Sequence, residues 1–313
     1  MARRASSFIP DPYFCRLNVI AGSPLMAVLS LVGVGRHRRF FSLLSVLFLL
    51  SGCALPALDL ITPRAGYERS VGLSYGEDPR QTLDVYLPVE PRDGAPTVVF
   101  FYGGSWQEGY KDGYRFLAQA LTDIGYRVVV PDYRLYPQVR FPAFVEDGAA
   151  AVGWVVNEGL AQDGLVLIGH SAGAHIAAML ALDDRFLTAA GVSRSNITAW
   201  VGLSGPYDFL PLRSLDLIDI FGGAEGIPGT QPVNFVSPDD PPALLIDGLE
   251  DRIVRPNNLP SLAEAYSRAG VSVQTRRYEG VNHNDTVASF SVRLRSRSPA
   301  FDDTVAFLQH WQR

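Results

Sequence analysis

Two segments of the chain carry a serine in the pattern G-x-S-x-G, a spacing typical of a nucleophilic serine. One is Gly169-His170-Ser171-Ala172-Gly173 and the other is Gly72-Leu73-Ser74-Tyr75-Gly76. Only the first lies between an apolar, strand-like run and a helical pattern, because Ser74 is followed by the turn-like sequence Glu77-Asp78-Pro79. A sharp strand-to-helix turn holds a serine hydroxyl exposed at a sheet edge, so Ser171 is predicted as the nucleophile. The alternative for Ser171 is a helix N-cap, and Ser74 is interpreted as a chance match.

A serine hydroxyl needs a base to remove its proton, and a histidine is the usual one. Among the five histidines, His37 lies in the N-terminal segment, His170 in the turn itself and His175 on the following helix. His310 falls near the end of a terminal helix and is expected at the surface. His283 remains, in the polar loop Tyr278–Asp285, and is predicted as the base, with an ordinary turn histidine as the alternative.

A carboxylate is expected to orient that histidine and to stabilise its charged form. Three acids follow the apolar run Leu244-Leu245-Ile246, namely Asp247, Glu250 and Asp251. Asp247 is expected on or at the end of a strand, whereas Asp251 lies beyond the turn that Gly248 begins. Asp251 is therefore predicted as the acid, with Asp247 and Glu250 as competitors.

A glycine turn, Gly103-Gly104-Ser105-Trp106, follows the apolar run Thr97–Tyr102. Backbone without side chains can approach a substrate closely. The amides of Gly104, Ser105 and Ala172 are predicted to form an oxyanion hole, and Trp106 is predicted to contact substrate. The alternative is an ordinary hairpin turn.

From residue 66 onward, short apolar runs alternate with longer helical patterns, which is typical of a doubly wound, mostly parallel α/β sheet with helices on both faces. The predicted strands are 83–87, 97–102, 127–130, 165–168, 199–203, 243–246 and 271–278. The predicted helices are 112–124, 142–158, 172–182, 257–269 and 301–311. The stretch 206–242, rich in Gly, Pro and Asp, is either a surface excursion or a cap over a site.

Composition excludes several classes of protein. The chain has 313 residues, 47% of them hydrophobic and 19% charged, which indicates a globular protein rather than a disordered one. A net charge of −5 argues against a general nucleic-acid binder. Two cysteines, Cys15 and Cys53, exclude a disulfide framework and a cysteine-rich metal site. No metal or cofactor is expected.

The N-terminal segment has the layout of a secretory signal. The basic cluster Arg36-His37-Arg38-Arg39 precedes the apolar run 40–50, which ends at Leu50-Ser51-Gly52-Cys53. Residues 1–52 are predicted as a signal peptide, 53–69 as a short tether and 70–313 as one catalytic domain. Residues 1–35 are long for a signal, which favours a later start such as Met26. The alternatives are a buried apolar helix and an uncleaved membrane anchor. A cleaved signal and an uncleaved anchor both place the domain outside the cytoplasm.

Taken together, these residues resemble the α/β-hydrolase superfamily, in the branch of hormone-sensitive-lipase-like and bacterial feruloyl-esterase-like carboxylesterases. The resemblance covers about residues 70–312, and the chain order Ser, Asp, His is the one that α/β-hydrolases use. It includes Phe100–Trp106, similar to the family's His-Gly-Gly-x-Trp, and Pro131–Pro137, followed by Phe141-Pro142-Ala143 and Asp147. Tyr102 stands where the family usually has His, Ser105 where one branch has a third Gly, and Asp247 where His is common.

The resemblance implies a serine esterase with Ser171 as nucleophile, Asp251 as acid and His283 as base. Tyr133-Arg134 and Asp147 match positions that brace the oxyanion loop and the next helix, and Tyr102 is expected to brace the loop in place of His. The four residues Leu50-Ser51-Gly52-Cys53 resemble a bacterial lipobox, which implies cleavage just before Cys53 and a lipid on its thiol. The protein is then held at the periplasmic side of the envelope, with the outer membrane favoured.

The expected partners are a small-molecule ester and, through the lipid, a membrane, with no nucleic acid. The alternatives are an arylformamidase or other amide hydrolase of the same fold, an acyltransferase acting on an envelope polymer, and a non-catalytic envelope lipoprotein. Fold alone does not choose among these.

Overall fold

A computed structural model describes residues 58–59, 61–223 and 227–311. In these ranges eight strands form one sheet in the order β1-β2-β4-β3-β5-β6-β7-β8. The strands are β1 (Tyr67–Ser74), β2 (Thr82–Pro88), β3 (Thr97–Phe101), β4 (Val128–Pro131), β5 (Leu165–His170), β6 (Ile197–Leu203), β7 (Ala243–Gly248) and β8 (Val273–Tyr278).

The sheet is antiparallel at one edge and parallel elsewhere. β1 pairs antiparallel with β2, and β2 pairs antiparallel with β4, whereas every pair from β4 across to β8 is parallel. Parallel neighbours need helical crossovers, which the helical patterns between these strands supply. The predicted fold class is confirmed: this is the α/β-hydrolase fold.

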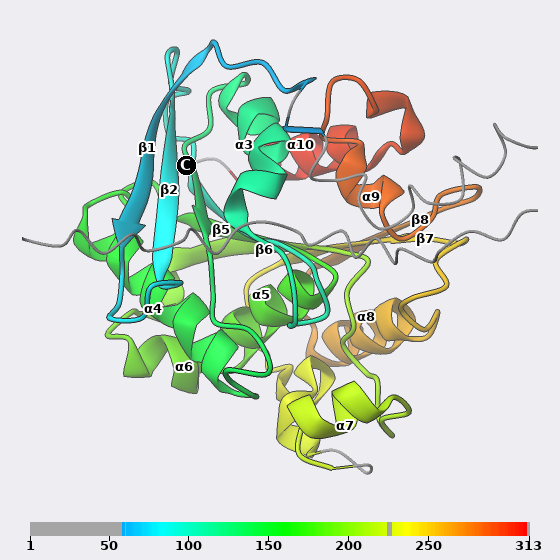
Figure 1. Ribbon diagram of the computed structural model, residues 1–313. Helices are drawn as coiled ribbons and strands as arrows, with labels where there is room; N and C mark the ends of the chain where they lie inside the picture. The colour runs from blue at the N-terminus through cyan, green and yellow to red at the C-terminus, as the bar shows by residue number, and fades with distance from the viewer. Residues whose placement is uncertain (1–57, 60, 224–226, 312–313) are drawn as a thin grey trace, which may run out of the picture. The chain divides into compact units, whose positions relative to one another are not determined.

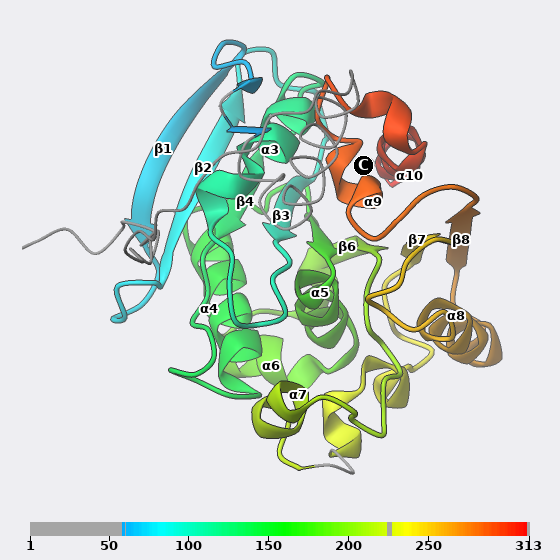
Figure 2. The same ribbon diagram turned by 45° about the vertical axis from the view of Figure 1, so that its right-hand side comes forward.

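Helices cover both faces of the sheet (Figures 1 and 2). α3 (Arg115–Thr122), α9 (Asp285–Ala288) and α10 (Ala300–His310) lie on one face. The opposite face carries α4 (Ala143–Asn157), α5 (Ala172–Leu182), α6 (Asp184–Ala189) and α8 (Asn258–Ala269). α7 (Leu215–Ile220) lies in the 206–242 segment, together with short 3-10 turns at Pro228–Thr230 and Pro232–Phe235.

The core lies at the centre of the sheet. All residues of β3, β5 and β7 are buried, which is why these strands read as continuous apolar runs. Every residue of α5 is buried as well, so this helix is fixed from all sides. The serine in front of α5 therefore sits between two fully buried elements.

Several elements differ from the predictions. β1 was not predicted, because an edge strand with a mostly exposed pattern carries polar and charged residues at most positions. The predicted helix 112–124 is divided into a 3-10 turn at Lys111–Tyr114 and the helix α3. The short helices α6, α7 and α9 were also missed, since four to six residues give too little periodicity.

The predicted signal peptide, Cys53 and the first residues of the tether lie outside the described residues. The later part of the tether packs on the domain, where Asp59 forms an ion pair with Arg115 of α3 at 2.6 Å. In the described ranges, no helix combines the length and apolar character needed to cross a bilayer.

Candidate active site

Ser171 lies on a strained turn between β5 and α5. Its φ of 55° and ψ of −122° are a conformation that residues other than glycine rarely adopt. The turn is tight, because a Cβ on Gly169 would lie 2.2 Å from the carbonyl oxygen of Gly173. A Cβ on Gly173 would lie 2.1 Å from the carbonyl oxygen of Phe101. Both glycines of the motif are therefore required by backbone packing around the serine.

His283 and Asp251 form a hydrogen-bonded pair. Nδ1 of His283 donates to Oδ2 of Asp251 at 2.8 Å, and both side chains are buried. The other oxygen of Asp251 accepts from the amides of Ile253 at 2.8 Å and Val254 at 3.0 Å. Burial acts to raise the pKa of Asp251, but these hydrogen bonds and the neighbouring imidazole hold it below its ordinary value. An ionised Asp251 thus fixes the tautomer of His283 that leaves Nε2 free of the proton.

The pair lies beside the serine turn. His170, the residue before Ser171, donates from Nε2 to the carbonyl oxygen of His283 at 3.2 Å. The centroids of the two imidazole rings are 5.0 Å apart. Burial, and then the charge of His283, lower the pKa of His170 to about 3, so His170 stays neutral. A structural histidine therefore joins the loop of the predicted base to the turn of the predicted nucleophile.

The competing acids lie elsewhere. Glu250 is exposed, and Asp247 is buried at the end of β7. Within the described residues, Oδ1 of Asp247 has no hydrogen-bond partner. Burial and the nearby charge of Asp251 raise the pKa of Asp247 to about 7. Of the three acids that the sequence offered, the structure brings Asp251 to His283.

The glycine turn after β3 packs directly against the serine. Gly104, Ser105 and Trp106 all have positive φ, at 137°, 51° and 59°. A Cβ on Gly103 would lie 3.0 Å from the Cβ of Ser171. In the ranges that the structure describes, no backbone hydrogen bond uses the amides of Gly104, Ser105 or Ala172 as donors. Free amides beside a nucleophile are what a developing oxyanion requires.

A polar network braces this turn from behind. The hydroxyl of Tyr102 donates to Asp132 at 2.8 Å and accepts from Arg80 at 2.8 Å. Arg80 also donates to the carbonyl oxygen of Gly109 at 3.0 Å, and Tyr133 donates to that of Tyr102 at 2.7 Å. Tyr102 is thus held through both its side-chain hydroxyl and its backbone carbonyl oxygen, as expected for a residue that braces the glycine turn in place of histidine.

Arg80 was missed as part of this network. It precedes β2, far from the motifs in sequence, and a lone arginine after a turn gives no signal of its partners. By contrast, Arg134 and Asp147 lie in the quoted motifs, and Arg134 donates to the carboxylate of Asp147 at 2.6 Å. Asp147 also accepts from the backbone amide of Arg134 at 2.8 Å, which fixes the start of the crossover to α4.

Trp106 lies inside an aromatic cluster. It is 4% exposed, and its ring contacts Phe144, His175, Phe209 and Phe221. The 206–242 segment supplies two of these partners and so packs against the glycine turn. Contact of Trp106 with substrate stays a prediction. Among the described residues, no group of three or more His, Cys, Asp or Glu is arranged to hold a metal ion.

Fold and site together define the class as an α/β-hydrolase with a candidate serine nucleophile. The chain belongs to the BD-FAE family, whose model matches residues 83–266. It is 32% identical over 239 residues to a probable isoprenylcysteine alpha-carbonyl methylesterase of Arabidopsis thaliana, which covers 67% of this chain. The match covers only 50% of that relative, so the chain spans about half its length.

Two further similarities are informative. A kynurenine formamidase of Danio rerio is 39% identical over 140 residues, covering 45% of this chain and 47% of the relative. Among solved structures, esterase B from Lactobacillus rhamnosus (HN001) superposes with a TM-score of 0.69 at 22% identity. The superposition covers 87% of this chain and 94% of the esterase B chain, which shows a shared fold.

Proposed function

We propose that this protein is a serine carboxylesterase that works through an acyl-enzyme on Ser171. The observation that carries the proposal is the hydrogen-bonded pair of His283 and ionised Asp251, held by His170 beside the strained turn of Ser171. A serine, a histidine and an oriented carboxylate in this arrangement form a nucleophile with its base. Family membership and the names of the relatives support the same reading.

The first half of the reaction acylates the enzyme. His283 accepts the proton of Ser171 on Nε2 while the serine oxygen bonds to the ester carbonyl carbon. The carbonyl oxygen gains the negative charge and is held by the amides of Gly104, Ser105 and Ala172. As the tetrahedral adduct collapses, His283 gives its proton to the departing alcohol oxygen, and Asp251 stabilises the imidazolium in between.

The second half returns the enzyme to its starting state. His283 removes a proton from water, whose oxygen bonds to the acyl carbon in the space that the alcohol has left. The same three amides hold the oxyanion again, and His283 then protonates the oxygen of Ser171 as the acid departs. The chain's own residues account for each proton in the cycle.

A formamidase is the second candidate function. The similarity to the Danio rerio kynurenine formamidase is the observation that favours it. The same serine, histidine and oxyanion amides would cleave an N-formyl bond, with an amine as leaving group instead of an alcohol. Only the substrate decides between the two.

One assay separates these candidates. The purified full chain in mild detergent, wild type beside Ser171→Ala, is given p-nitrophenyl esters, a feruloyl ester and N-formylkynurenine. We expect turnover of esters that the substitution abolishes. Preference for N-formylkynurenine by kcat/KM would favour the formamidase, and no serine-dependent turnover would favour an acyltransferase or a non-catalytic protein.

We also propose that the protein is exported and anchored by a lipid on Cys53. The support is the order of basic cluster, apolar run and Leu-Ser-Gly-Cys in the sequence. Incorporation of a labelled fatty acid into the wild type, and its loss in Cys53→Ser, is the expected result. Label that persists in Cys53→Ser, or protein that stays in the cytoplasm, would contradict the anchor.

A further inference from the structure

Aromatic rings fill one flank of the candidate site. Trp106 meets the ring of His175 edge-on at 5.2 Å and lies roughly parallel to Phe209 at 6.2 Å. Phe221 lies at the centre, because its ring is 4.8 Å from Trp106 and 5.5 Å from His175. We call Trp106, His175, Phe209 and Phe221 the aromatic plug; none of them is more than 5% exposed.

The plug closes the gap between two loops that flank the serine. Trp106 ends the turn after β3, and Phe209 lies in the loop after β6, while Ser171 follows β5 between them in the sheet. His175 lies one helical turn beyond the serine, since its amide donates to the carbonyl oxygen of Ser171 at 3.2 Å. The plug therefore sits over the first turn of α5, immediately past the nucleophile.

This flank differs from the one that holds the base. His283 packs on His170, the residue before Ser171, whereas the plug includes His175, four residues after it. The leaving oxygen must lie near His283, which protonates it, and the carbonyl oxygen must lie at the free amides. The acyl substituent has to take the remaining direction, away from the histidine and toward the plug.

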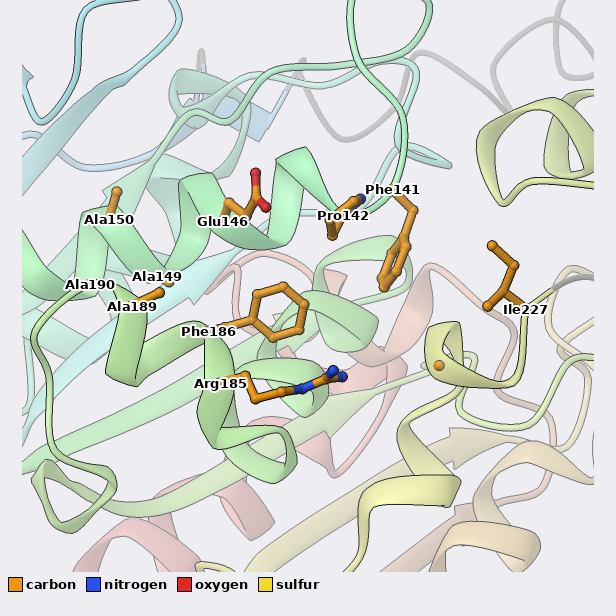
Figure 3. Close-up of a pocket in the computed structure, with 11 residues that line it drawn as sticks. Phe141, Pro142, Glu146, Ala149, Ala150, Arg185, Phe186, Ala189, Ala190 and Ile227 are labelled. Carbon is orange, nitrogen blue, oxygen red and sulfur yellow. The ribbon is translucent and has the colours of Figure 1, made fainter.

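A groove of about 610 Å³ lies beyond the plug, between α4, α6 and the 227–229 segment. Figure 3 shows Phe141 and Ile227 near one end of it and the small side chains of Ala149, Ala150, Ala189 and Ala190 near the other. Phe141 is part of the groove wall, and its ring is also 5.8 Å from Phe221 and 6.3 Å from His175. The plug thus separates Ser171 from a largely apolar space.

We propose that the aromatic plug sets the acyl specificity of this site, restricting it to esters of short-chain acids such as acetate. This inference rests on the proposed esterase function and names its substrate class. Phe221 is the specificity-determining side chain, since it contacts both the oxyanion turn and the groove wall. Its replacement by alanine empties the space between the oxyanion turn and Phe141, which gives a longer acyl chain more room beside Ser171.

The test compares acyl-chain profiles. The full-length protein, wild type beside Phe221→Ala, is assayed on p-nitrophenyl acetate, butyrate, octanoate and palmitate. In the wild type, kcat/KM for octanoate is expected to fall at least about 100-fold below that for acetate, since the longer chain has no room. In Phe221→Ala, the octanoate-to-acetate ratio is expected to rise at least about tenfold.

Two further variants keep the result interpretable. Phe209→Leu opens the plug with less loss of packing, and Phe307→Leu removes comparable buried volume in α10, away from the site. Thermal unfolding identifies variants that are folded. The ratio should rise in Phe209→Leu and stay at the wild-type value in Phe307→Leu.

The outcomes distinguish this inference from the function on which it rests. Serine-dependent turnover in which the wild type prefers octanoate would overturn the inference alone. An unchanged ratio in folded Phe221→Ala and Phe209→Leu would do the same. Absence of Ser171-dependent turnover on every ester would remove the esterase function itself, and the inference with it.

Discussion

The two G-x-S-x-G segments have the same pattern and very different surroundings. Ser74 ends β1, the antiparallel edge strand, and its hydroxyl donates to the carbonyl oxygen of Gly76 at 2.7 Å. Ser171 follows β5 in the middle of the parallel part of the sheet, with φ at 55°. The hydroxyl of Ser74 forms a hydrogen bond within its own turn. Ser171, by contrast, has a strained backbone conformation that the surrounding packing must enforce.

The glycines of the two motifs differ in the same way. A Cβ on Gly72 would meet no atom within 4 Å, and one on Gly76 would meet the flexible side chain of Gln81, whereas one on Gly173 would lie 2.1 Å from a backbone oxygen. The residue pattern is therefore a consequence of packing at one site and a coincidence at the other. The comparison shows that such a motif acquires meaning from the strand before it and the helix after it.

The largest expected effect is the difference in kcat between variants of the two motif serines. Ser171→Ala should lower kcat on an activated ester by about 10⁴- to 10⁶-fold, because the nucleophile is lost while binding remains. Ser74→Ala should stay within about twofold of the wild type, since an exposed edge strand has no part in the chemistry. Initial rates of purified proteins check this, and a comparable loss in both variants would contradict the distinction.

A second comparison concerns two neighbouring acids in the loop between β7 and α8, of which only Asp251 contacts His283. Asp251→Asn should lower kcat by about 10³- to 10⁴-fold, because an amide favours the wrong tautomer of His283. Glu250→Gln is the matched control on the adjacent, exposed position, and should be nearly silent. If the losses measured for these two variants were equal, Asp251 would not be the orienting acid.

The motif glycines should differ in stability. Gly173→Ala should lower the free energy of unfolding by about 2–4 kcal/mol, since the backbone of Phe101 leaves no room for a methyl group. Gly72→Ala should cost about 1 kcal/mol, because only its positive φ is unfavourable for alanine. Urea unfolding measures both values, and a reversed order would show that the packing around Gly173 is looser than described.

Asp247 gives a smaller, pH-dependent effect. Its pKa is about 7 when folded, so between about pH 4 and 7 the folded state holds a proton that the unfolded chain has lost. Stability conferred by this group is therefore greatest at low pH and declines as pH rises through that window. The asparagine in Asp247→Asn does not titrate, so the free energy of unfolding of this variant should exceed that of the wild type by on the order of 2–4 kcal/mol at pH 8.

Urea unfolding at pH 4.5 and pH 8 checks the sign. The difference between the two proteins should shrink to about 1 kcal/mol at the lower pH, and the exposed Asp216→Asn should follow the wild type at both. A constant difference across pH would mean that burial of Asp247 does not perturb its ionisation.

The central strands were predictable because burial on both faces leaves a continuous apolar run. The predicted strand 165–168 is extended by Gly169 and His170, and 243–246 by Asp247 and Gly248. The added residues are polar or small because these strands end at the candidate site. A prediction from hydropathy alone therefore ends each strand two residues too early. β1 was not predicted for the opposite reason, because this exposed strand has no apolar face that a hydropathy pattern would show.

The site residues were predictable where a motif ties type to position, as at Ser171 and the glycine turn. The choice of Asp251 over Asp247 depended on where β7 ends, which the sequence indicated only through Gly248. The role of Arg80 and the aromatic plug could not be predicted, because each is formed by contacts between segments far apart in the chain.

The most direct test of the account is covalent labelling with a p-nitrophenyl alkylphosphonate, followed by peptide mass spectrometry of the folded protein. The phosphorus resembles the tetrahedral intermediate, so it should react with an activated serine in an oxyanion hole. We predict one phosphonate per chain, on Ser171, with none on Ser74 and none after His283→Ala. Label on another serine, or equal labelling of Ser171 without His283, would contradict the proposed triad.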